Sequence, residues 1–353
     1  MYSDPLLLGM LRAITPLDET AMAEARERQA QLTKPAGSLG ALEDASVVLS
    51  GIQGVCPPRA LERPVVAVFA ADHGVHARGV TPWPQEVTAS MIENFRAGGA
   101  AVNVLARQVG AEVYVVDMGV AADVEPDEHV LDRKIRKGTS DLAAGPAMSR
   151  DEAAAAAFLG ADVARQLIAA GHDCLLTGDM GIANTTASAA LVAAFTGADA
   201  AEVTGRGTGI DDQTHTHKTA IVSVALERRP RTDDPLETLA TLGGFEHAGL
   251  VGFVLAAAEA RVPVVLDGLI AGAAALVVQA IAPDALGYCF AGHRSAEPGH
   301  RVALQHLGLR PLVDLDLRLG EGTGAALAFP LVEAAGAMLR EMATFDSAGV
   351  ARK

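Results

Sequence analysis

Cysteine, aromatic residues and positive charge are all scarce in this sequence of 353 residues. Its 3 cysteines lie far apart and form no Cys-x-x-Cys pair, so neither a disulfide framework nor a cysteine-based zinc site is indicated. Aromatic residues make up 4% against 50% hydrophobic residues, which predicts a mainly aliphatic core. The 28 Lys and Arg against 43 Asp and Glu leave a net charge of −15, which argues against nucleic acid or an anionic membrane as a partner.

Long apolar runs are missing as well. The longest mainly apolar stretch, residues 268–282, is shorter than the ~20 residues that a membrane-spanning helix needs. Residues 1–10 contain Asp4 and no basic segment, which is unlike a signal peptide. We therefore expect a soluble, cytoplasmic protein whose cysteines are reduced thiols.

Five short aliphatic segments have the composition of buried strands, and each leads into a turn that carries glycine. They are residues 65–70, 113–116, 174–176, 262–266 and 286–290. Helical patterns lie among them at residues 151–169, 186–195, 213–227, 246–261, 269–281 and 298–307. This alternation predicts an α/β fold: a three-layer, Rossmann-like parallel sheet with helices on both faces. Ligands of such sheets bind at the carboxyl ends of the strands, where the five turns would meet.

The two ends of the chain differ from this middle part. Helix-like, charged segments at 19–28 and 39–52, and a long helical pattern at 323–344, come without strand signals. We expect residues 1–60 and 325–353 to form a small helical domain, and residues 61–324 to form a large α/β domain that binds substrate. The proline-bearing stretches 123–127 and 228–235 are predicted loops.

Glycine is abundant: 36 of the 353 residues are glycine, which is a larger fraction than the ~7% that is usual in proteins. Two clusters have the form G-x-G-x-G, at residues 205–209 and 320–324. Neither matches the dinucleotide fingerprint G-x-G-x-x-G or the P-loop. Closely spaced glycines let backbone N–H groups approach an anion, but a tight turn at the start of a helix explains them equally well.

Three charged residues are candidates for chemistry. Glu321, between two glycines and next to a long apolar helix, is either a partly desolvated general base or a solvated glutamate in a loop or first helical turn. Asp179 follows a strand and either contacts a sugar hydroxyl or forms an ordinary Asx turn. Lys218 is either a phosphate or carboxylate partner or a surface lysine.

Two histidines lie near Lys218, at positions 215 and 217. Their closeness in sequence suggests a pair of metal ligands, but the spacing does not support one. Residues i and i+2 do not share a helix face, and the other histidines show no ligand spacing. We therefore expect no metal site.

Several motifs, taken in their order along the chain, resemble one known family, the nicotinate-nucleotide–dimethylbenzimidazole phosphoribosyltransferases of cobalamin assembly. The matching stretches are residues 34–40 (Lys-Pro-Ala-Gly-Ser-Leu-Gly), 72–75, 82–88, 94–103, 178–186, 205–211, 291–300 and 317–328. The resemblance implies a parallel-sheet domain, a small helical domain built from both termini, and a homodimer. It also implies no cofactor, with nicotinate mononucleotide and a benzimidazole-type base as substrates.

The resemblance further implies the reaction and the roles of individual residues. Glu321 would take the N–H proton of 5,6-dimethylbenzimidazole while this base displaces nicotinate at C1′ with inversion, giving α-ribazole 5′-phosphate. Asp179 and Lys218 would lie near the sugar and the leaving group, although many members have Glu where this chain has Asp179. The other implied residues are Gly181, Gly207, Gly209, Gly292 and Ser295 around the phosphate and ribose, and Asp72, Pro84, Gln85, Met91 and Leu319 around the base.

Two other function classes stay open on the sequence alone. A nucleotide-binding sensor without catalytic activity would have the same fold and pocket. A nucleotide-dependent oxidoreductase would also use such a sheet, although the missing G-x-G-x-x-G fingerprint disfavours it.

Overall fold

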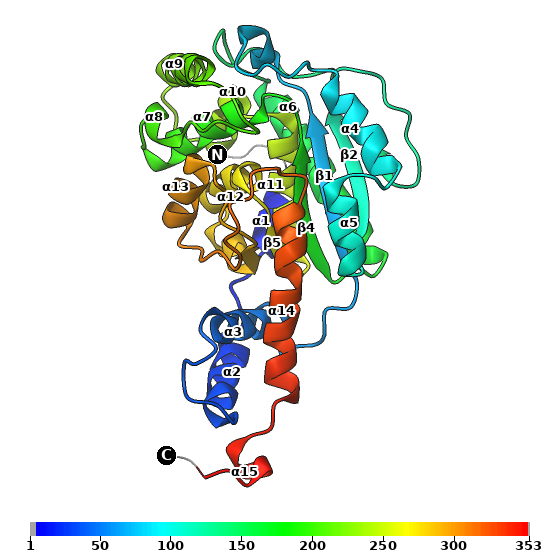
Figure 1. Ribbon diagram of the computed structural model, residues 1–353, viewed down its shortest axis with the longest axis vertical. Helices are drawn as coiled ribbons and strands as arrows, with labels where there is room; N and C mark the ends of the chain where they lie inside the picture. Colours follow the sequence, from blue (N-terminus) through cyan, green and yellow to red (C-terminus); the bar gives the residue numbers. More distant parts are fainter. Residues whose placement is uncertain (1–4, 352–353) are drawn as a thin grey trace.

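Six parallel strands form the centre of the computed structural model, which describes residues 5–351 (Figure 1). The strand order is β3-β2-β1-β4-β5-β6, and every neighbouring pair is parallel. This is the strand order of the doubly wound Rossmann fold, so the predicted fold class is confirmed. The strands are β1 (Pro64–Ala71), β2 (Glu112–Gly119), β3 (Val130–Asp132), β4 (Cys174–Met180), β5 (Val264–Leu266) and β6 (Cys289–Ala291).

The central strand β1 shows why these segments form a parallel sheet. All eight of its residues are buried, because both faces of the sheet are covered by helices. Some strand predictions differ from the structure; for example, the predicted strand 262–266 starts two residues before β5. The sequence analysis missed β3, which has three residues and follows a polar loop. It also began the last strand too early, because Pro283 starts the 3₁₀ helix η2 (Pro283–Tyr288) just before β6.

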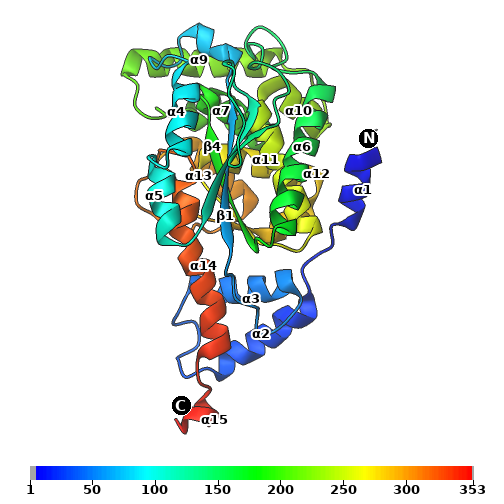
Figure 2. The same ribbon diagram turned by 90° about the vertical axis from the view of Figure 1, so that its right-hand side faces the viewer.

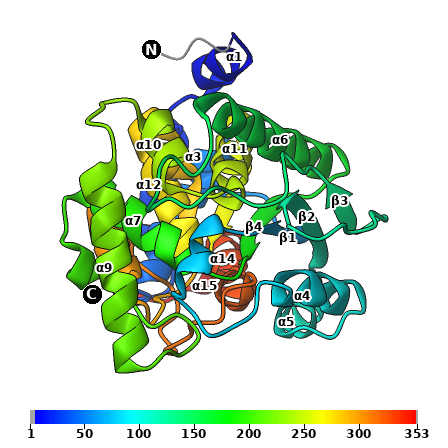
Figure 3. The same ribbon diagram turned by 90° about the horizontal axis from the view of Figure 1, so that it is seen from above.

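Helices cover the two faces of the sheet unequally (Figure 3). On one face, α11 (Phe245–Glu259) packs on the central strands and α6 (Arg150–Ala169) packs on α11. These two helices approach so closely that a Cβ atom on Gly160 would lie 1.9 Å from the carbonyl oxygen of Gly249. On the other face lie α4 (Val87–Arg96), α5 (Ala101–Gln108) and the first half of α14 (Thr323–Glu341).

The remaining helices surround the β4–β6 half of the sheet and the carboxyl ends of the strands. They are α7 (Asn184–Thr196), α8 (Ala200–Val203), α9 (Asp212–Arg228), α10 (Pro235–Leu242), α12 (Leu269–Ile281) and α13 (Pro298–Leu307). The predicted helices between residues 151 and 307 are thus all present, with ends that shift by one or two residues. The short helices α4, α5 and α10 were not predicted, because few apolar positions repeat within 8 to 10 residues.

A smaller helical unit lies beyond the amino ends of the strands (Figure 2). It joins α2 (Glu19–Gln31), α3 (Ala41–Gln53) and the second half of α14 around a small core of Ala25, Leu32, Val47 and Leu339. The terminal helices α1 (Pro5–Ala13) and α15 (Phe345–Ala348) lie apart from it. The predicted domain limits at residues 60 and 325 stay a prediction, and residues 1–4 and 352–353 of those ranges lie outside the described residues.

Between residues 5 and 351, the structure contains no helix that combines the length and the apolar character needed to cross a membrane.

Candidate functional site

The candidate site lies where the strand order reverses, between β1 and β4. From β1 the chain continues to β2 and β3 on one side, and from β4 it continues to β5 and β6 on the other. Diverging loops open a crevice at such a switch point. The residues that end the strands here are polar and buried: Asp72 and His73 after β1, Asp179 in β4, and Asp267 after β5.

The crevice has two overlapping lobes that share part of their lining. Both are lined by Gly181, Ile182, Asn184, Thr185, Gly207 and Thr208. The first lobe adds Val80, Thr81, Trp83, Ala183, Thr186, Arg206, Ile210 and Lys218. The second adds Asp179, Met180, Gly268, Leu269, Ile270, His293, Ser295, Glu297, Arg318, Leu319 and Gly320.

Glu321 lies next to the second lobe and is held in an unusual backbone conformation. Gly320, Glu321 and Gly322 have φ angles of 81°, 67° and 97°, so a non-glycine residue stands between two glycines in the left-handed region. Its carbonyl oxygen lies against β4, where a Cβ atom on Gly178 would approach it to 2.4 Å. The glycines of the 320–324 cluster and Gly178 therefore allow the close approach that places Glu321.

Glu321 is 5% exposed, and the Oε2 atom of its carboxylate has no hydrogen-bond partner among the described residues. Burial raises its pKa, the N–H of Val102 opposes the shift, and the nearby charge of Asp267 adds to it. A buried carboxylate with a free oxygen and a raised pKa suits a general base. The alternative that Glu321 is a solvated loop glutamate is therefore wrong, because the residue is buried.

Asp267 anchors the turn that carries Glu321. Its carboxylate accepts hydrogen bonds from the N–H groups of Gly322 (3.2 Å), Gly324 (2.7 Å) and Ala325 (3.0 Å) at the start of α14. Burial raises its pKa, while His293 and these N–H groups lower it. The sequence analysis did not single out Asp267, although its place in a strand-end Asp-Gly pair was a signal.

Asp179 lines the second lobe and is also buried. Its Oδ2 atom accepts a hydrogen bond from Asn184 at 2.9 Å, and its Oδ1 atom has no partner in the described part of the chain. Burial raises its pKa well above the usual value, and the charge of Asp267 adds to this shift. The backbone N–H of Glu321 donates to the carbonyl of Asp179, so the two candidate residues are direct neighbours.

Lys218 and the first glycine cluster meet at the first lobe. Lys218 is 2% exposed, and its Nζ atom donates to Thr185 Oγ1 (2.9 Å) and to the carbonyl of Gly205 (3.1 Å). Burial lowers its pKa to about 8, although the nearby Glu297 opposes this shift. Lys218 is therefore not a surface lysine. The N–H of Gly207 donates to Glu297 at 2.7 Å, so a carboxylate already sits on this glycine turn.

The other expected phosphate and base residues fall into two groups. Gly181, Ser295 and Leu319 line the cleft. Gly209, Gly292, Pro84, Gln85 and Met91 line neither lobe, although Val80, Thr81 and Trp83 of the segment just before Pro84 do.

Asp72 differs most from its expected place in the base site. It is 1% exposed, and its carboxylate accepts hydrogen bonds from Thr88 Oγ1 (2.7 Å) and the N–H of Ala121 (2.8 Å). Asp72 therefore lies beneath the wall of the cleft, and its carboxylate binds other residues of the protein instead of facing the cleft.

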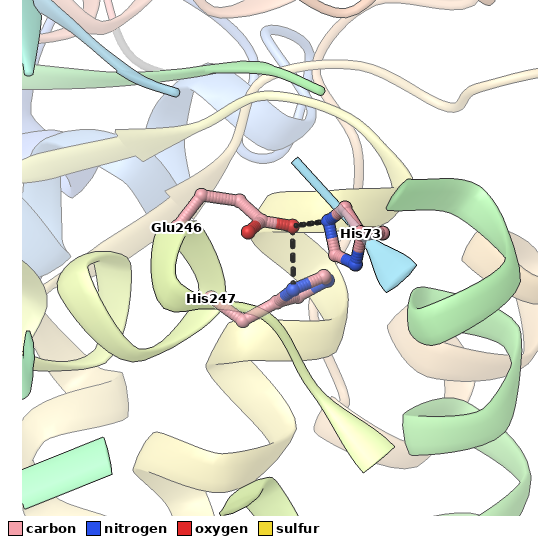
Figure 4. A group of neighbouring side chains, drawn as sticks. All are labelled: His73, Glu246 and His247. Atoms are coloured by element: carbon pink, nitrogen blue, oxygen red, sulfur yellow. Dashed lines mark hydrogen bonds and ion pairs between the residues drawn. The ribbon is translucent and has the colours of Figure 1, made fainter. Parts of the chain in front are cut away.

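A buried cluster beneath β1 escaped the sequence analysis, which assigned its residues only to a helix and a turn. His73 Nε2 and His247 Nδ1 lie 2.7 Å and 2.8 Å from Glu246 Oε1, and all three side chains are fully buried (Figure 4). They form the one group of three possible metal ligands found in residues 5–351. Tetrahedral zinc with bonds near ~2.1 Å would separate its ligands by about 3.4 Å, so these distances are typical of hydrogen bonds.

The charges of this cluster balance one another. Burial alone would raise the pKa of Glu246, but the two histidines hold it well below its usual value. Burial alone would lower the pKa of His73, but Glu246 raises it. The cluster is thus an internal ion pair.

The separate histidines His215 and His217 bind different backbone carbonyls, those of Thr204 and Arg78.

Comparisons with known proteins identify the family of this chain. A family model described as "Phosphoribosyltransferase" matches residues 14–350. Nicotinate-nucleotide–dimethylbenzimidazole phosphoribosyltransferases of Salinispora tropica and Chloroflexus aurantiacus are 59% and 54% identical to the chain. The first comparison covers 97% of this chain and 98% of the relative, and the second covers 99% of each.

A solved structure of the same enzyme from Thermus thermophilus superposes with a TM-score of 0.91 at 47% identity. This match covers 96% of this chain and 100% of the other. A second structure from that organism, described as CobT, gives a TM-score of 0.92 at 48% identity, covering 95% and 100%. The chain therefore belongs to the nicotinate-nucleotide–dimethylbenzimidazole phosphoribosyltransferase family.

Proposed function

We propose that this phosphoribosyltransferase moves the 5-phosphoribosyl group of nicotinate mononucleotide to 5,6-dimethylbenzimidazole. The products would be α-ribazole 5′-phosphate, inverted at C1′, and nicotinate. The observation that carries the proposal is the buried carboxylate of Glu321, one oxygen of which has no hydrogen-bond partner among the described residues, at the edge of a cleft in this family's fold. The names of the relatives, which contain nicotinate nucleotide and dimethylbenzimidazole, support the two substrates.

The reaction needs one proton acceptor. A ring nitrogen of the benzimidazole forms the new bond to C1′, and the old bond breaks with its electron pair going to the ring nitrogen of nicotinate. This turns the pyridinium into a neutral pyridine, so the leaving group needs no proton. The bound benzimidazole becomes a cation and gives its N–H proton to the carboxylate of Glu321. Such general-base assistance is typically worth ~10²–10⁴-fold in rate.

Positioning by the protein supplies the remaining catalysis. Asp267 fixes the turn of Glu321 through three backbone N–H groups, so the base is held before substrate binds. Asp179 lies beside that turn and faces the ribose and the leaving group. Lys218, whose pKa is about 8, offers a cation to the 5′-phosphate, which binds near Gly181 and Ser295. Because the phosphate is an anion, its binding favours the protonated lysine.

Other parts of the proposal concern assembly. The chain forms a homodimer in the cytoplasm, requires no cofactor, and divides into the small helical domain (1–60 and 325–353) and the large domain (61–324). Gly207 forms part of the phosphate side of the cleft and Leu319 part of the base side. Gly209 and Gly292 at the phosphate, and Pro84, Gln85 and Met91 at the base, stay predictions, because none of the five lines either lobe. Size-exclusion chromatography with light scattering tests the dimer.

The deciding experiment is incubation with nicotinate mononucleotide and 5,6-dimethylbenzimidazole, with products followed by mass spectrometry and the anomer assigned by NMR. The proposal predicts equal amounts of nicotinate and α-ribazole 5′-phosphate. Calorimetric binding of nicotinate mononucleotide without nicotinate release would instead indicate a sensor. A panel of other benzimidazoles, purines and phenolic compounds in the same assay identifies the preferred acceptor.

A further inference from the structure

We infer that Asp72 and Thr88, neither of which faces the cleft, are positioning residues that set the affinity for the acceptor base. They do so by fixing residues 80–88 against the loop after β4. This inference rests on the proposed function, because it concerns the second substrate of the same site.

One hydroxyl group joins three loops. Thr88 lies in the first turn of α4 and is fully buried. Its Oγ1 atom donates to Asp72 Oδ1 at 2.7 Å and accepts from the N–H of Ile182 at 3.1 Å. Asp72 Oδ2 in turn accepts from the N–H of Ala121 at 2.8 Å. Segments that follow β1, β2 and β4 are thereby tied to the start of α4. We call the Asp72–Thr88–Ile182 contacts the clamp.

The segments that the clamp joins both contribute lining residues to the cleft. Ile182 lines both lobes of the cleft. Upstream of Thr88, the same segment supplies Val80, Thr81 and Trp83 to the first lobe. Trp83 is 50% exposed, and its carbonyl accepts a hydrogen bond from His76 at 2.8 Å. This second contact holds the middle of the segment, whereas the clamp holds its end against the opposite wall.

The chemistry of the segment indicates which substrate it serves. Its three lining residues are uncharged and include an aromatic ring, which suits a flat, apolar base rather than an anionic nucleotide. The first lobe also contains the cations Arg206 and Lys218, but these come from other elements, the loop before α9 and α9 itself, which the clamp does not hold. Loosening the clamp is therefore expected to affect the base more than nicotinate mononucleotide.

Removing the hydroxyl leaves buried polar groups unpaired. In Thr88→Val, a substitution of nearly equal volume, Asp72 Oδ1 loses its donor and the N–H of Ile182 loses its acceptor. The carboxylate of Asp72 is buried and the N–H of Ile182 is partly buried, so the segment relaxes to find other partners for them. Thr88→Ser keeps the hydroxyl and removes only a methyl group.

Steady-state kinetics with each substrate varied tests the clamp. We expect Thr88→Val to raise KM for 5,6-dimethylbenzimidazole by about tenfold, while KM for nicotinate mononucleotide changes by less than about twofold. Thr88→Ser is expected to restore the wild-type KM for the base. Thr88→Cys, with a weak donor of similar size, should give an intermediate value and keeps the test open if the valine variant fails to fold.

A matched control separates the clamp from general destabilisation. Ser46 is a fully buried hydroxyl in the small helical unit, accepting from Gln29 at 2.7 Å and donating to the carbonyl of Glu43 at 2.7 Å. Ser46→Ala should lower the melting temperature without changing either KM. The clamp is overturned if Thr88→Val leaves KM for the base unchanged, raises both KM values equally, or behaves like Ser46→Ala.

Failure of the proposed function is a separate outcome. If the wild type forms no α-ribazole 5′-phosphate, calorimetry with 5,6-dimethylbenzimidazole still reports on the clamp. If the base binds the wild type about tenfold more tightly than it binds Thr88→Val, the clamp is supported. Equal affinities for the two proteins contradict the clamp.

Discussion

Two helices of this enzyme begin beside a buried glutamate, and the two glutamates have opposite electrostatics. At the start of α11, Glu246 faces two histidines, and its pKa is held well below its usual value although it is fully buried. At the start of α14, Glu321 has the carboxylate of Asp267 nearby, and its pKa is raised. Burial alone therefore does not make a base, because what decides is whether a cation shares the site.

The difference also indicates what each region contributes. The α11 start is an internal ion pair whose loss would leave a charge unpaired, so it serves stability. The α14 start keeps a buried carboxylate beside another one, with left-handed backbone at Glu321, so it costs stability, which fits the role proposed for it in the reaction. The four predictions below test this division, starting with the largest effect.

Replacing Glu321 should abolish most of the activity. Glu321→Gln keeps the shape of the side chain but cannot take a proton, so we expect kcat to fall by ~10²–10⁴-fold. Binding of nicotinate mononucleotide, measured by calorimetry, should survive. The melting temperature should stay equal or rise, because a buried charge disappears. Turnover near the wild-type rate would show that Glu321 is not the base.

Replacing Glu246 should have the opposite profile. Glu246→Gln removes one member of a buried ion pair, and such changes typically cost about 3–5 kcal/mol. Denaturant unfolding should show this loss, while kcat of the folded enzyme should fall far less than in Glu321→Gln. If the two glutamine variants lose the same stability, the contrast between the two helix starts is wrong.

Adding one methyl group behind Glu321 should disturb the base without touching its carboxylate. In Gly178→Ala the new Cβ atom would meet the carbonyl oxygen of Glu321 at 2.4 Å, so the turn or β4 must shift. We expect kcat to fall by about 10-fold or more, as misplacement of a catalytic group does. Gly145→Ala is the control, since nothing lies within 4 Å of its Cβ position. Unchanged kcat in Gly178→Ala would mean that the turn tolerates displacement.

The pH dependence of kcat should report the raised pKa of Glu321. Because the base must be ionised, activity should decline as the pH falls through this pKa, at a pH above the ordinary glutamate value near 4.5. The acidic limb should be missing from the residual activity of Glu321→Gln. A limb at or below the ordinary value would contradict a desolvated base.

Sequence reasoning reached the fold and the place of the site more readily than the environment of each residue. The strand-end turns predicted the carboxyl edge of the sheet, because strand and helix patterns are local. Asp72 ends a strand just as Asp179 does, yet one faces Thr88 and the other lines the cleft. That distinction depends on the segment packed opposite each carboxylate, which no local pattern contains.

The Glu246 cluster was beyond reach for the same reason. Its histidines are 174 residues apart in the sequence, at positions 73 and 247, and meet only when α11 packs on the sheet. Within one helical pattern, Glu246 and His247 looked like ordinary first-turn residues. Glu321 was easier to single out, because the flanking glycines that permit its backbone conformation are adjacent to it in sequence.

The long helix α14 carries a mechanical consequence. Its first turn holds Glu321 in place at the carboxyl end of the sheet, and its last turns belong to the small helical unit with α2 and α3. Nineteen residues at ~1.5 Å each make a rod of about 28 Å. Pro330 lies inside this helix and cannot donate the backbone hydrogen bond that other interior residues donate, so the helix is weakened near its middle. This weak point separates the turn of Glu321 from the small helical unit, so movements of that unit are only partly transmitted to the cleft.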